Sequence, residues 1–246
     1  MAANNEFVGG KVMTTLYQHG TLALLVPGLF TGTQTVGELL KHGDTGIGTL
    51  EGLDGELIIM DGIVYQVNAM GQVRVVNADE TVPFANVHKA HPQPKIAVED
   101  ASSDALKQIA LKELKTENLF AAIRVDGEFS QMHTRAVLPQ TKPYPTLAAT
   151  AEGQHEFNAT NIKGTIIGYF SPVIYAGAVA AGFHLHFLSE DHVMGGHILD
   201  FDLAKGNLQI ETFDNFNLHL PVHDPDFLET KINAKQAMRD IAKAEN

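Results

Sequence analysis

The sequence is organised around Gly182-Phe183-His184-Leu185-His186-Phe187, which is followed after a short polar stretch by Gly195-Gly196-His197-Ile198-Leu199-Asp200. Side chains alternate between the two faces of a β-strand, so His184 and His186 would share one face, about 6.8 Å apart, with the apolar residues on the other. Residues 189–196 are suited to reverse the chain, which would place His197 on a returning strand. Three imidazoles could then bind a metal ion and leave a coordination position open.

The His-x-His pair is weak evidence when it is taken alone. The chain has 12 histidines in 246 residues, and such a pair is expected roughly 0.6 times by chance. The alternation with large apolar residues means that the histidine face is either solvent-exposed or lines a cavity, while the opposite face is core. Two interpretations follow: a metal site, or surface histidines on a half-buried strand.

The third ligand has an alternative in Glu190, which follows His186 by four residues. The spacing His-x-His-x3-Glu with nearby glycines resembles the first metal motif of the cupins, which bind iron, manganese or zinc in a small barrel. The second cupin motif, a glycine and a proline followed by a histidine, is not found around His219 or His223. A cupin-like metal-dependent oxygenase is therefore the alternative enzyme. A non-catalytic protein that binds a metal or a small molecule is the alternative from another class.

The composition excludes several classes of protein. The formal net charge of −12, from 17 basic and 29 acidic residues, argues against a nucleic-acid partner, because phosphate binding favours a basic surface. The chain has no cysteine, so a metal would be held by nitrogen and oxygen ligands. The sequence does not open on a basic segment followed by an apolar run, and no stretch approaches the roughly 18 apolar residues of a membrane helix. We expect a soluble, cytoplasmic protein with no membrane partner.

The pattern before residue 98 is mostly short strands and turns. Met60-Asp61-Gly62-Ile63 predicts a hairpin, because Asp-Gly provides the positive φ angles of a two-residue turn, and residues 22–26 are typical of a strand. Residues 103–115 form the first strong helical pattern, with a serine cap. We predict a β-rich α/β fold in two domains: an N-terminal β-rich domain over residues 1–100 and a C-terminal metal-binding domain over residues 101–246.

Two glycine-containing triplets predict further hairpins in the second half of the chain. They are Asp126-Gly127-Glu128 and Lys205-Gly206-Asn207, each between two apolar runs. Residues 139–145 contain three prolines, so they can form neither a helix nor a central strand. We interpret that segment as a connector or as a loop over a site.

Several motifs together give the chain a specific resemblance. Over nearly its whole length it resembles the bacterial α-acetolactate decarboxylases. The motifs are Tyr17-Gln18-His19-Gly20-Thr21, Gly46-Ile47-Gly48-Thr49, Leu53-Asp54-Gly55-Glu56-Leu57-Ile58, Met132-His133-Thr134-Arg135, and the histidine segment with Gly195-Gly196-His197.

The resemblance implies a zinc enzyme. In that family three histidines hold Zn²⁺, and they fall on His184, His186 and His197. The implied fold has an N-terminal domain with a mixed β-sheet and a C-terminal domain with a smaller mixed sheet that holds the metal, assembled as a homodimer. The choice of His197 as third ligand, in place of Glu190, separates this family from the cupins.

The family's other active-site residues are carried over position by position. Its arginine falls on Arg135, and its threonine and glutamate fall on Thr49 and Glu56. A further glutamate near the family's C-terminus falls on Glu245, where the surrounding residues match poorly. The implied reaction is the zinc-dependent decarboxylation of 2-acetolactate to acetoin and CO2, in acetoin and butanediol biosynthesis. Zinc is expected to chelate the keto and hydroxyl oxygens of the substrate and to stabilise an enediolate intermediate.

Overall fold

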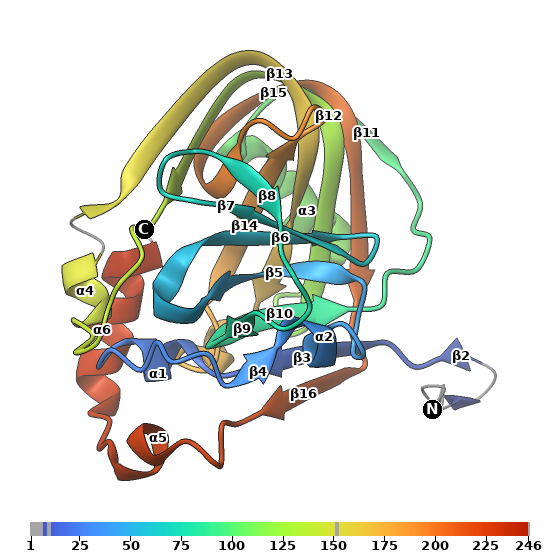
Figure 1. Cartoon of the computed structure of the whole chain (residues 1–246). Coiled ribbons are helices and arrows are strands. Elements are labelled where there is room, and N and C mark those ends of the chain that lie inside the picture. Colours follow the sequence, from blue (N-terminus) through green and yellow to red (C-terminus); the bar gives the residue numbers. More distant parts are fainter. Residues whose placement is uncertain (1–6, 9–10, 151–152, 246) are drawn as a thin grey trace.

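Two β-sheets that pack against each other make up most of the molecule (Figure 1). The structure, a computed structural model, describes residues 7–8, 11–150 and 153–245. For residues 7–8, 11–12, 236 and 242–245 it describes the backbone and not the side chains. One sheet has seven strands and the other has five. No helix within the described ranges is long and apolar enough to span a lipid bilayer.

The seven-stranded sheet comes mainly from the first part of the chain. Its strand order is β16-β3-β10-β5-β6-β7-β8. The sheet is mixed, because β16 runs parallel to β3 while all the other neighbouring strands of the sheet pair antiparallel. Its strands are β3 (Thr15–His19), β5 (Thr45–Leu50), β6 (Asp54–Met60), β7 (Ile63–Val67), β8 (Val73–Val75), β10 (Phe84–His88) and β16 (Asn215–His219).

The five-stranded sheet contains three very long strands that arch over in Figure 1. Its order is β11-β15-β12-β13-β14, and β14 also pairs with the beginning of β15, so four of the strands close into a ring. All of these pairings are antiparallel, so the mixed sheet expected for this half of the chain is not observed. The strands are β11 (Ile96–Ser102), β12 (Ala121–Ala136), β13 (His155–Ser171), β14 (Gly182–Ser189) and β15 (Gly195–Thr212).

The two hairpins predicted at glycine triplets in this half of the chain are wrong. Gly127 lies in the interior of β12 and Gly206 in the interior of β15, and Gly127 pairs with Gly206 on one side and with Gly164 of β13 on the other. A Cβ atom on Gly127 would lie 2.7 Å from the carbonyl oxygen of Lys205. Glycine inside a strand marks a bend or a close approach of backbones. The three glycines therefore form a row across neighbouring strands, and the chain continues where a turn was expected.

The hairpin predicted at residues 60–63 is confirmed. Asp61 and Gly62 have φ angles of 53° and 78°, and they join β6 to β7. The helix predicted near residue 103 is also confirmed, as α3 (Ser103–Leu114). The hydroxyl of Ser102 caps it by accepting a hydrogen bond from the backbone N–H of Ala105.

The strand predicted over residues 22–26 is instead a helix, α1 (Leu22–Leu25). A short continuous apolar run does not distinguish a buried strand from a buried helix. The other elements are short, apart from α6. They are α2 (Val36–Leu39), α4 (Leu147–Thr150), α5 (Pro225–Glu229), α6 (Ala234–Glu245), the 3-10 turns η1 (Glu51–Leu53) and η3 (Val173–Tyr175), and the strands β1 (Phe7–Val8), β2 (Lys11–Val12), β4 (Gln34–Thr35) and β9 (Thr81–Val82).

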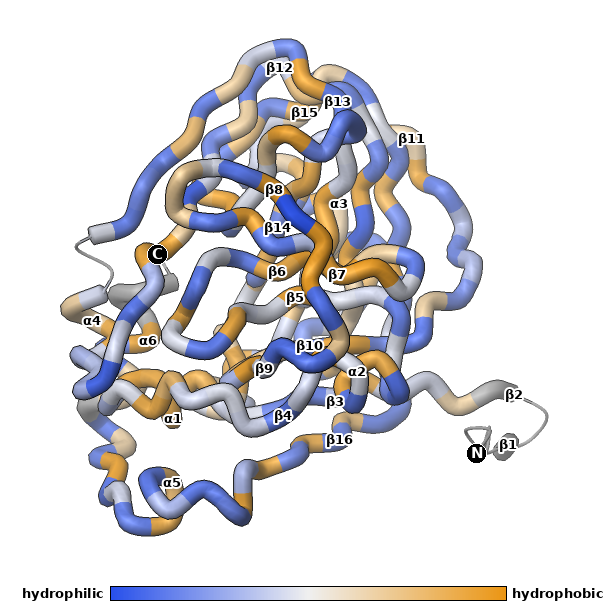
Figure 2. Tube along the Cα trace, viewed as in Figure 1, coloured by the Kyte–Doolittle hydropathy of each residue, from blue (hydrophilic) through white to orange (hydrophobic). Residues whose placement is uncertain are grey.

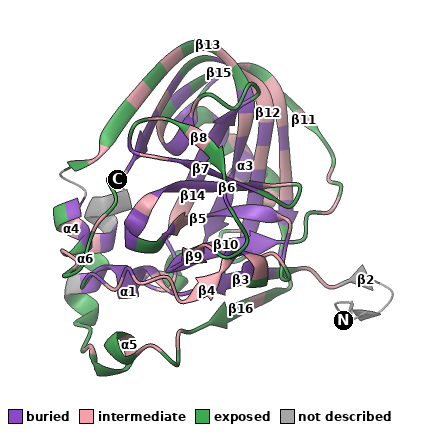
Figure 3. Cartoon of the chain, viewed as in Figure 1, coloured by how far each residue is buried: buried purple, intermediate pink, exposed green. Residues whose placement is uncertain are grey.

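The cores follow from the alternation of side chains along the strands (Figure 2). One core lies between the inner face of the five-stranded sheet and α3, and another lies between the two sheets. Strands β5, β6 and β10 are buried almost throughout (Figure 3). Because β16 completes the first sheet and the sheets share a core, the two halves of the chain are closely joined. The division into domains at residue 100 stays a prediction.

Candidate metal centre and active site

Three histidine side chains converge where β14 meets β15. Among the residues that the structure describes, His184, His186 and His197 form the one group suited to hold a metal ion, with one ring nitrogen from each within 4.8 Å of the others. Their ring centroids are 5.0 to 5.4 Å apart. Glu190, the alternative third ligand, is exposed and lies outside this group.

The local sequence explains why these rings meet. Leu185 and Phe187 point into the core under α3, so the histidines between and beside them face the other sheet. The chain reverses after Ser189, whose hydroxyl accepts hydrogen bonds from the backbones of Val193 and Met194. His197 then pairs directly with His186 across the two strands.

Gly196 is required at the start of the returning strand. Its φ angle is 128°, and a Cβ atom there would lie 2.5 Å from the carbonyl oxygen of Arg135. The buried hydroxyl of Thr134 donates to the carbonyl of Gly195 at 2.8 Å. The backbone that carries His197 is thereby held tightly against β12.

Burial keeps the three imidazoles neutral. It lowers the pKa of His184 to about 3, with a further contribution from the cation of Arg135. Burial also lowers the pKa of His186 and of His197 well below the ordinary value. Neutral imidazoles have the lone pairs that metal ions require.

The tautomer of His186 is fixed by the neighbouring sheet. Its Nδ1 lies 2.8 Å from the carbonyl oxygen of Leu57 on β6, and because a carbonyl only accepts, Nδ1 must donate. The lone pair is then on Nε2, which is buried and has no hydrogen-bond partner. Glu56 Oε2 is 3.4 Å from this nitrogen, so two acceptors face each other. A metal cation bound by the three histidines fits this arrangement, since metal-binding histidines commonly donate their other nitrogen to a carbonyl or carboxylate.

One cavity brings together most of the polar residues named from the sequence. It is lined by Thr49, Glu56, Arg135 and the three histidines. Glu245 is the last residue of α6, and its side chain lies outside the part of the chain that the structure describes. The remaining lining is Leu22, Leu25, Gly48, Leu53, Phe84, Val137, Leu147 and Thr150.

The turn between β5 and β6 places two of these polar residues side by side. Thr49 pairs directly with Glu56 across the two strands, and the Thr49 hydroxyl donates to the carbonyl of Gly55 at 2.8 Å. Gly52, Leu53 and Gly55 all have positive φ angles, from 55° to 72°. Such backbone conformations are uncommon for leucine and often occur at functional sites. The tight turn brings Leu53 into the cavity wall while Glu56 remains only 9% exposed.

Arg135 reaches the cavity from the five-stranded sheet. It pairs with His197 across β12 and β15, and only 7% of it is exposed. Its Nη1 donates to Gln154 Oε1 at 2.5 Å. The guanidinium of Arg135 and the carboxyl of Glu56 thus line the same cavity as the three imidazoles.

Sequence reasoning missed the apolar half of the cavity. Leu22 and Leu25 come from α1, Leu147 comes from α4, and both helices pack on α6. The proline-rich segment does lie beside the site: Gln140 donates its backbone N–H to Gly52, and the residues on either side of the segment, Val137 and Leu147, line the cavity. The prolines were the only signal of this wall, because the short helices lack a periodic pattern.

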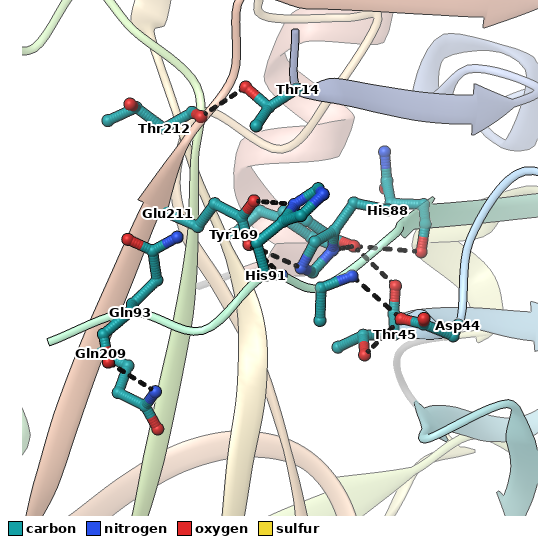
Figure 4. Close-up of polar contacts among 12 residues, drawn as sticks. Thr14, Asp44, Thr45, His88, His91, Gln93, Tyr169, Gln209, Glu211 and Thr212 are labelled. Atoms are coloured by element: carbon teal, nitrogen blue, oxygen red, sulfur yellow. Dashed lines mark hydrogen bonds and ion pairs between the residues drawn. The ribbon is translucent and has the colours of Figure 1, made fainter. Parts of the chain in front are cut away.

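A second pair of histidines, the buried His88 and the half-buried His91, lies between the two sheets (Figure 4). His88 Nδ1 is 2.8 Å from the hydroxyl of Tyr169, and His91 Nδ1 is 2.7 Å from Glu211 Oε1. His88 Nε2 is 3.9 Å from the other oxygen of Glu211, which also accepts the backbone N–H of His91. Burial lowers the pKa of His88 to about 4. This group ties β10, β13 and β15 together and is not a metal cluster.

Known proteins resemble this chain in sequence over most of its length. The model of the alpha-acetolactate decarboxylase family matches residues 16–234. An alpha-acetolactate decarboxylase of Lactococcus lactis subsp. lactis is 40% identical over 235 residues, which are 95% of this chain and 99% of the relative. The alpha-acetolactate decarboxylase of Methanosarcina mazei is 34% identical over 239 residues, which are 97% of this chain and 82% of the relative.

Solved structures show the same fold. The alpha-acetolactate decarboxylase of Bacillus subtilis strain 168 has a TM-score of 0.91 at 33% identity, covering 94% of this chain and 99% of its own. A Staphylococcus aureus protein described as of unknown function and similar to alpha-acetolactate decarboxylase also has a TM-score of 0.91, at 38% identity, covering 94% of this chain and 100% of its own. The chain is thus an enzyme of the carbon–carbon lyase class, a carboxy-lyase. It belongs to the alpha-acetolactate decarboxylase family.

Proposed function

We propose that the protein decarboxylates 2-acetolactate to acetoin and CO2 with a zinc ion held by His184, His186 and His197. The observation that carries the proposal is the convergence of these rings beside Glu56 and Arg135 in one cavity. Three neutral nitrogen ligands with an open position are typical of catalytic zinc. When bound, zinc would supply a Lewis-acidic charge to the substrate oxygens as the carbon–carbon bond breaks.

Arg135 is suited to bind the carboxylate that is lost. A guanidinium fork matches a carboxylate in geometry, and burial strengthens the pairing. Held in this way, the carboxylate can stand perpendicular to the plane of the keto group. In that orientation, the electrons of the breaking bond flow toward the keto oxygen.

Glu56 and Thr49 complete the polar side of the cavity. Departure of CO2 leaves a carbon that must gain a proton, and Glu56 is a buried carboxyl that can deliver it or hold the substrate hydroxyl. The hydrogen of the Thr49 hydroxyl is used on Gly55, so its oxygen is available to accept from the substrate. Together the two groups would orient the hydroxyl-bearing carbon.

The apolar half of the cavity suits the remaining atoms of the substrate. Leu22, Leu25 and Leu147 form an apolar wall opposite the charged groups. The two methyl groups of 2-acetolactate would lie against this wall, which excludes water from the reacting carbon. From the family resemblance of the sequence, the proposal also includes that the protein is a cytoplasmic homodimer and acts in acetoin and butanediol biosynthesis.

Metal analysis and a product assay test the proposal together. The purified protein should contain about one zinc per chain, and it should form acetoin and CO2 from racemic 2-acetolactate. A chelator should abolish turnover, and added zinc should restore it. Oxygen consumption with bound iron would instead indicate a cupin-like oxygenase, and binding of acetolactate without CO2 release would indicate a non-catalytic binding protein.

A further inference from the structure

The turn between β5 and β6 brings one large apolar side chain to the cavity. Leu53 is only 4% exposed, and it lines the cavity together with Thr49 and Glu56, which precede and follow it in the chain. It packs in the same apolar core as Leu22 and Leu25 of α1. Leu53 is thus the part of the apolar wall that comes from the same turn as two of the polar groups.

The backbone of Leu53 has a conformation that favours glycine. Its φ angle is 55°, and the glycines on either side of it in the turn, Gly52 and Gly55, have φ angles of 72° and 71°. Glycine adopts such angles readily, whereas other residues do so at a cost. Side chains in this conformation persist only where the surroundings hold them, and they cluster at ligand sites. The feature that glycine would lack here is the side chain that lines the cavity.

Hydrogen bonds hold the turn in place from three directions. The backbone N–H of Gly52 donates to Phe30 at 2.8 Å, and the carbonyl of Gly52 accepts from Gln140 at 2.7 Å. The hydroxyl of Thr49 donates to the carbonyl of Gly55 at 2.8 Å. The turn is therefore tied to the segment after α1 and to the proline-rich segment. A wall that is fixed in this way cannot move aside for a larger ligand.

The cavity has little room to spare. Its volume is about 70 Å³, and one water molecule needs roughly 10–15 Å³. A single additional methylene in an apolar pocket changes kcat/KM by roughly 10- to 200-fold. Because Thr49 and Glu56 would orient the carbon that bears the hydroxyl, the alkyl group on that carbon would lie beside the turn that joins them.

We propose that Leu53 is a specificity-determining residue, which limits the alkyl group on the hydroxyl-bearing carbon of the substrate to methyl. This inference rests on the proposed function and adds to it the substrate class: 2-hydroxy-2-methyl-3-oxo acids. The acyl group of the substrate, whose keto oxygen would face the metal, is not limited by Leu53.

Two isomers that are each one methylene larger than acetolactate test the inference. In 2-ethyl-2-hydroxy-3-oxobutanoate the extra methylene is on the hydroxyl-bearing carbon, and in 2-hydroxy-2-methyl-3-oxopentanoate it is on the acyl group. Both would lose CO2 and gain a proton as acetolactate does, so CO2 release measures kcat/KM for all three. The isomers have the same size and charge, and they differ in the position of the methylene.

Leu53→Ala is compared with Leu50→Ala as the matched control. Leu50 begins the same turn and is also 4% exposed, but it packs in a different core and does not line the cavity. Loss of folded or zinc-loaded protein lowers kcat/KM for every substrate by the same factor. The ratio of kcat/KM values therefore isolates specificity from stability.

We expect the unaltered protein to prefer acetolactate over the 2-ethyl isomer by about tenfold or more. Leu53→Ala should reduce that preference about tenfold and change the preference over the 3-oxopentanoate isomer by less than about twofold. Leu50→Ala should change both preferences by less than about twofold.

Other outcomes overturn the inference. They are an unaltered protein that accepts the 2-ethyl isomer as readily as acetolactate, an equal gain for both isomers in Leu53→Ala, or equal ratios in Leu53→Ala and Leu50→Ala. Should Leu53→Ala fail to fold, Leu53→Gly decides the question, because glycine adopts the positive φ angle readily. The proposed function fails in a different way, namely when the unaltered, zinc-loaded protein releases no CO2 from acetolactate.

Discussion

The two histidine groups each contain a fully buried ring, His88 in one and His186 in the other, and they differ in what their nitrogens face. At the junction between the sheets, the His88 and His91 rings contact a tyrosine hydroxyl and a carboxylate. At the cavity, His186 Nε2 has no hydrogen-bond partner and points toward two other imidazoles. Burial keeps His88 neutral, as it keeps the cavity histidines neutral. Burial alone therefore does not make a metal site; convergence of available lone pairs does.

The largest expected effect comes from replacing a cavity histidine. We expect the His186→Ala variant to lose its bound zinc, and its activity to fall at least about 100-fold with it, because one of three ligands is removed. His88→Ala is the contrasting control: it should keep zinc and lose about 1–3 kcal/mol of stability, because the hydroxyl of Tyr169 loses one of its buried hydrogen-bond partners. Metal analysis, turnover and urea unfolding measure the three quantities. Full zinc content in His186→Ala would make the two groups equivalent and refute the assignment.

The next effect concerns the cation beside the metal centre. Arg135→Lys should fold and bind zinc but lose about 100-fold in activity, since a point charge does not reproduce the planar fork. Steady-state kinetics on the zinc-loaded variant provide the measurement. Turnover equal to that of the unaltered protein would remove Arg135 from the mechanism.

A somewhat smaller effect is expected at the neighbouring carboxylate. Glu56→Gln keeps the shape of the side chain and removes its acid–base function, so zinc should remain while kcat falls by about 10- to 100-fold. The comparison of kcat with zinc content separates a chemical role from loss of a ligand. Normal turnover would leave Glu56 as a carboxylate of the turn.

The smallest effect is on stability, and it comes from histidines away from the cavity. Burial lowers the pKa of His19 and of His88 to about 4, so both are neutral in the folded protein, whereas the unfolded chain titrates near 6.5. The unfolded state then binds more protons below pH 6.5. Stability should be full above that pH and fall as the pH approaches 4, by about 2 kcal/mol per histidine between pH 7 and 5. Urea midpoints across this range test the slope, which should be shallower in His88→Gln.

Local sequence patterns predicted the arrangement of the histidines better than they predicted the lengths of the strands in the sheets. Alternation of histidine with apolar residues predicted that His184 and His186 share a face, and the glycines after them predicted the return of His197. The long strands could not be predicted, because Gly127 and Gly206 have the signature of turns, and it is their pairing with neighbouring strands that keeps the chain extended. The apolar wall depends on short helices that are distant in sequence. Their positions are set by packing on α6, which no local pattern encodes.

The parallel pairing of β16 with β3 affects when the protein can fold during its synthesis on the ribosome. Residue 15 at one end of the chain meets residue 215, and α6, which follows β16, backs the apolar wall of the cavity. Contacts between such distant residues form slowly, because a large loop must close before they are made. A ribosome that has released only the first hundred residues holds a sheet without its last strand. We therefore expect neither sheet nor catalytic pocket to be finished until almost the entire polypeptide has emerged.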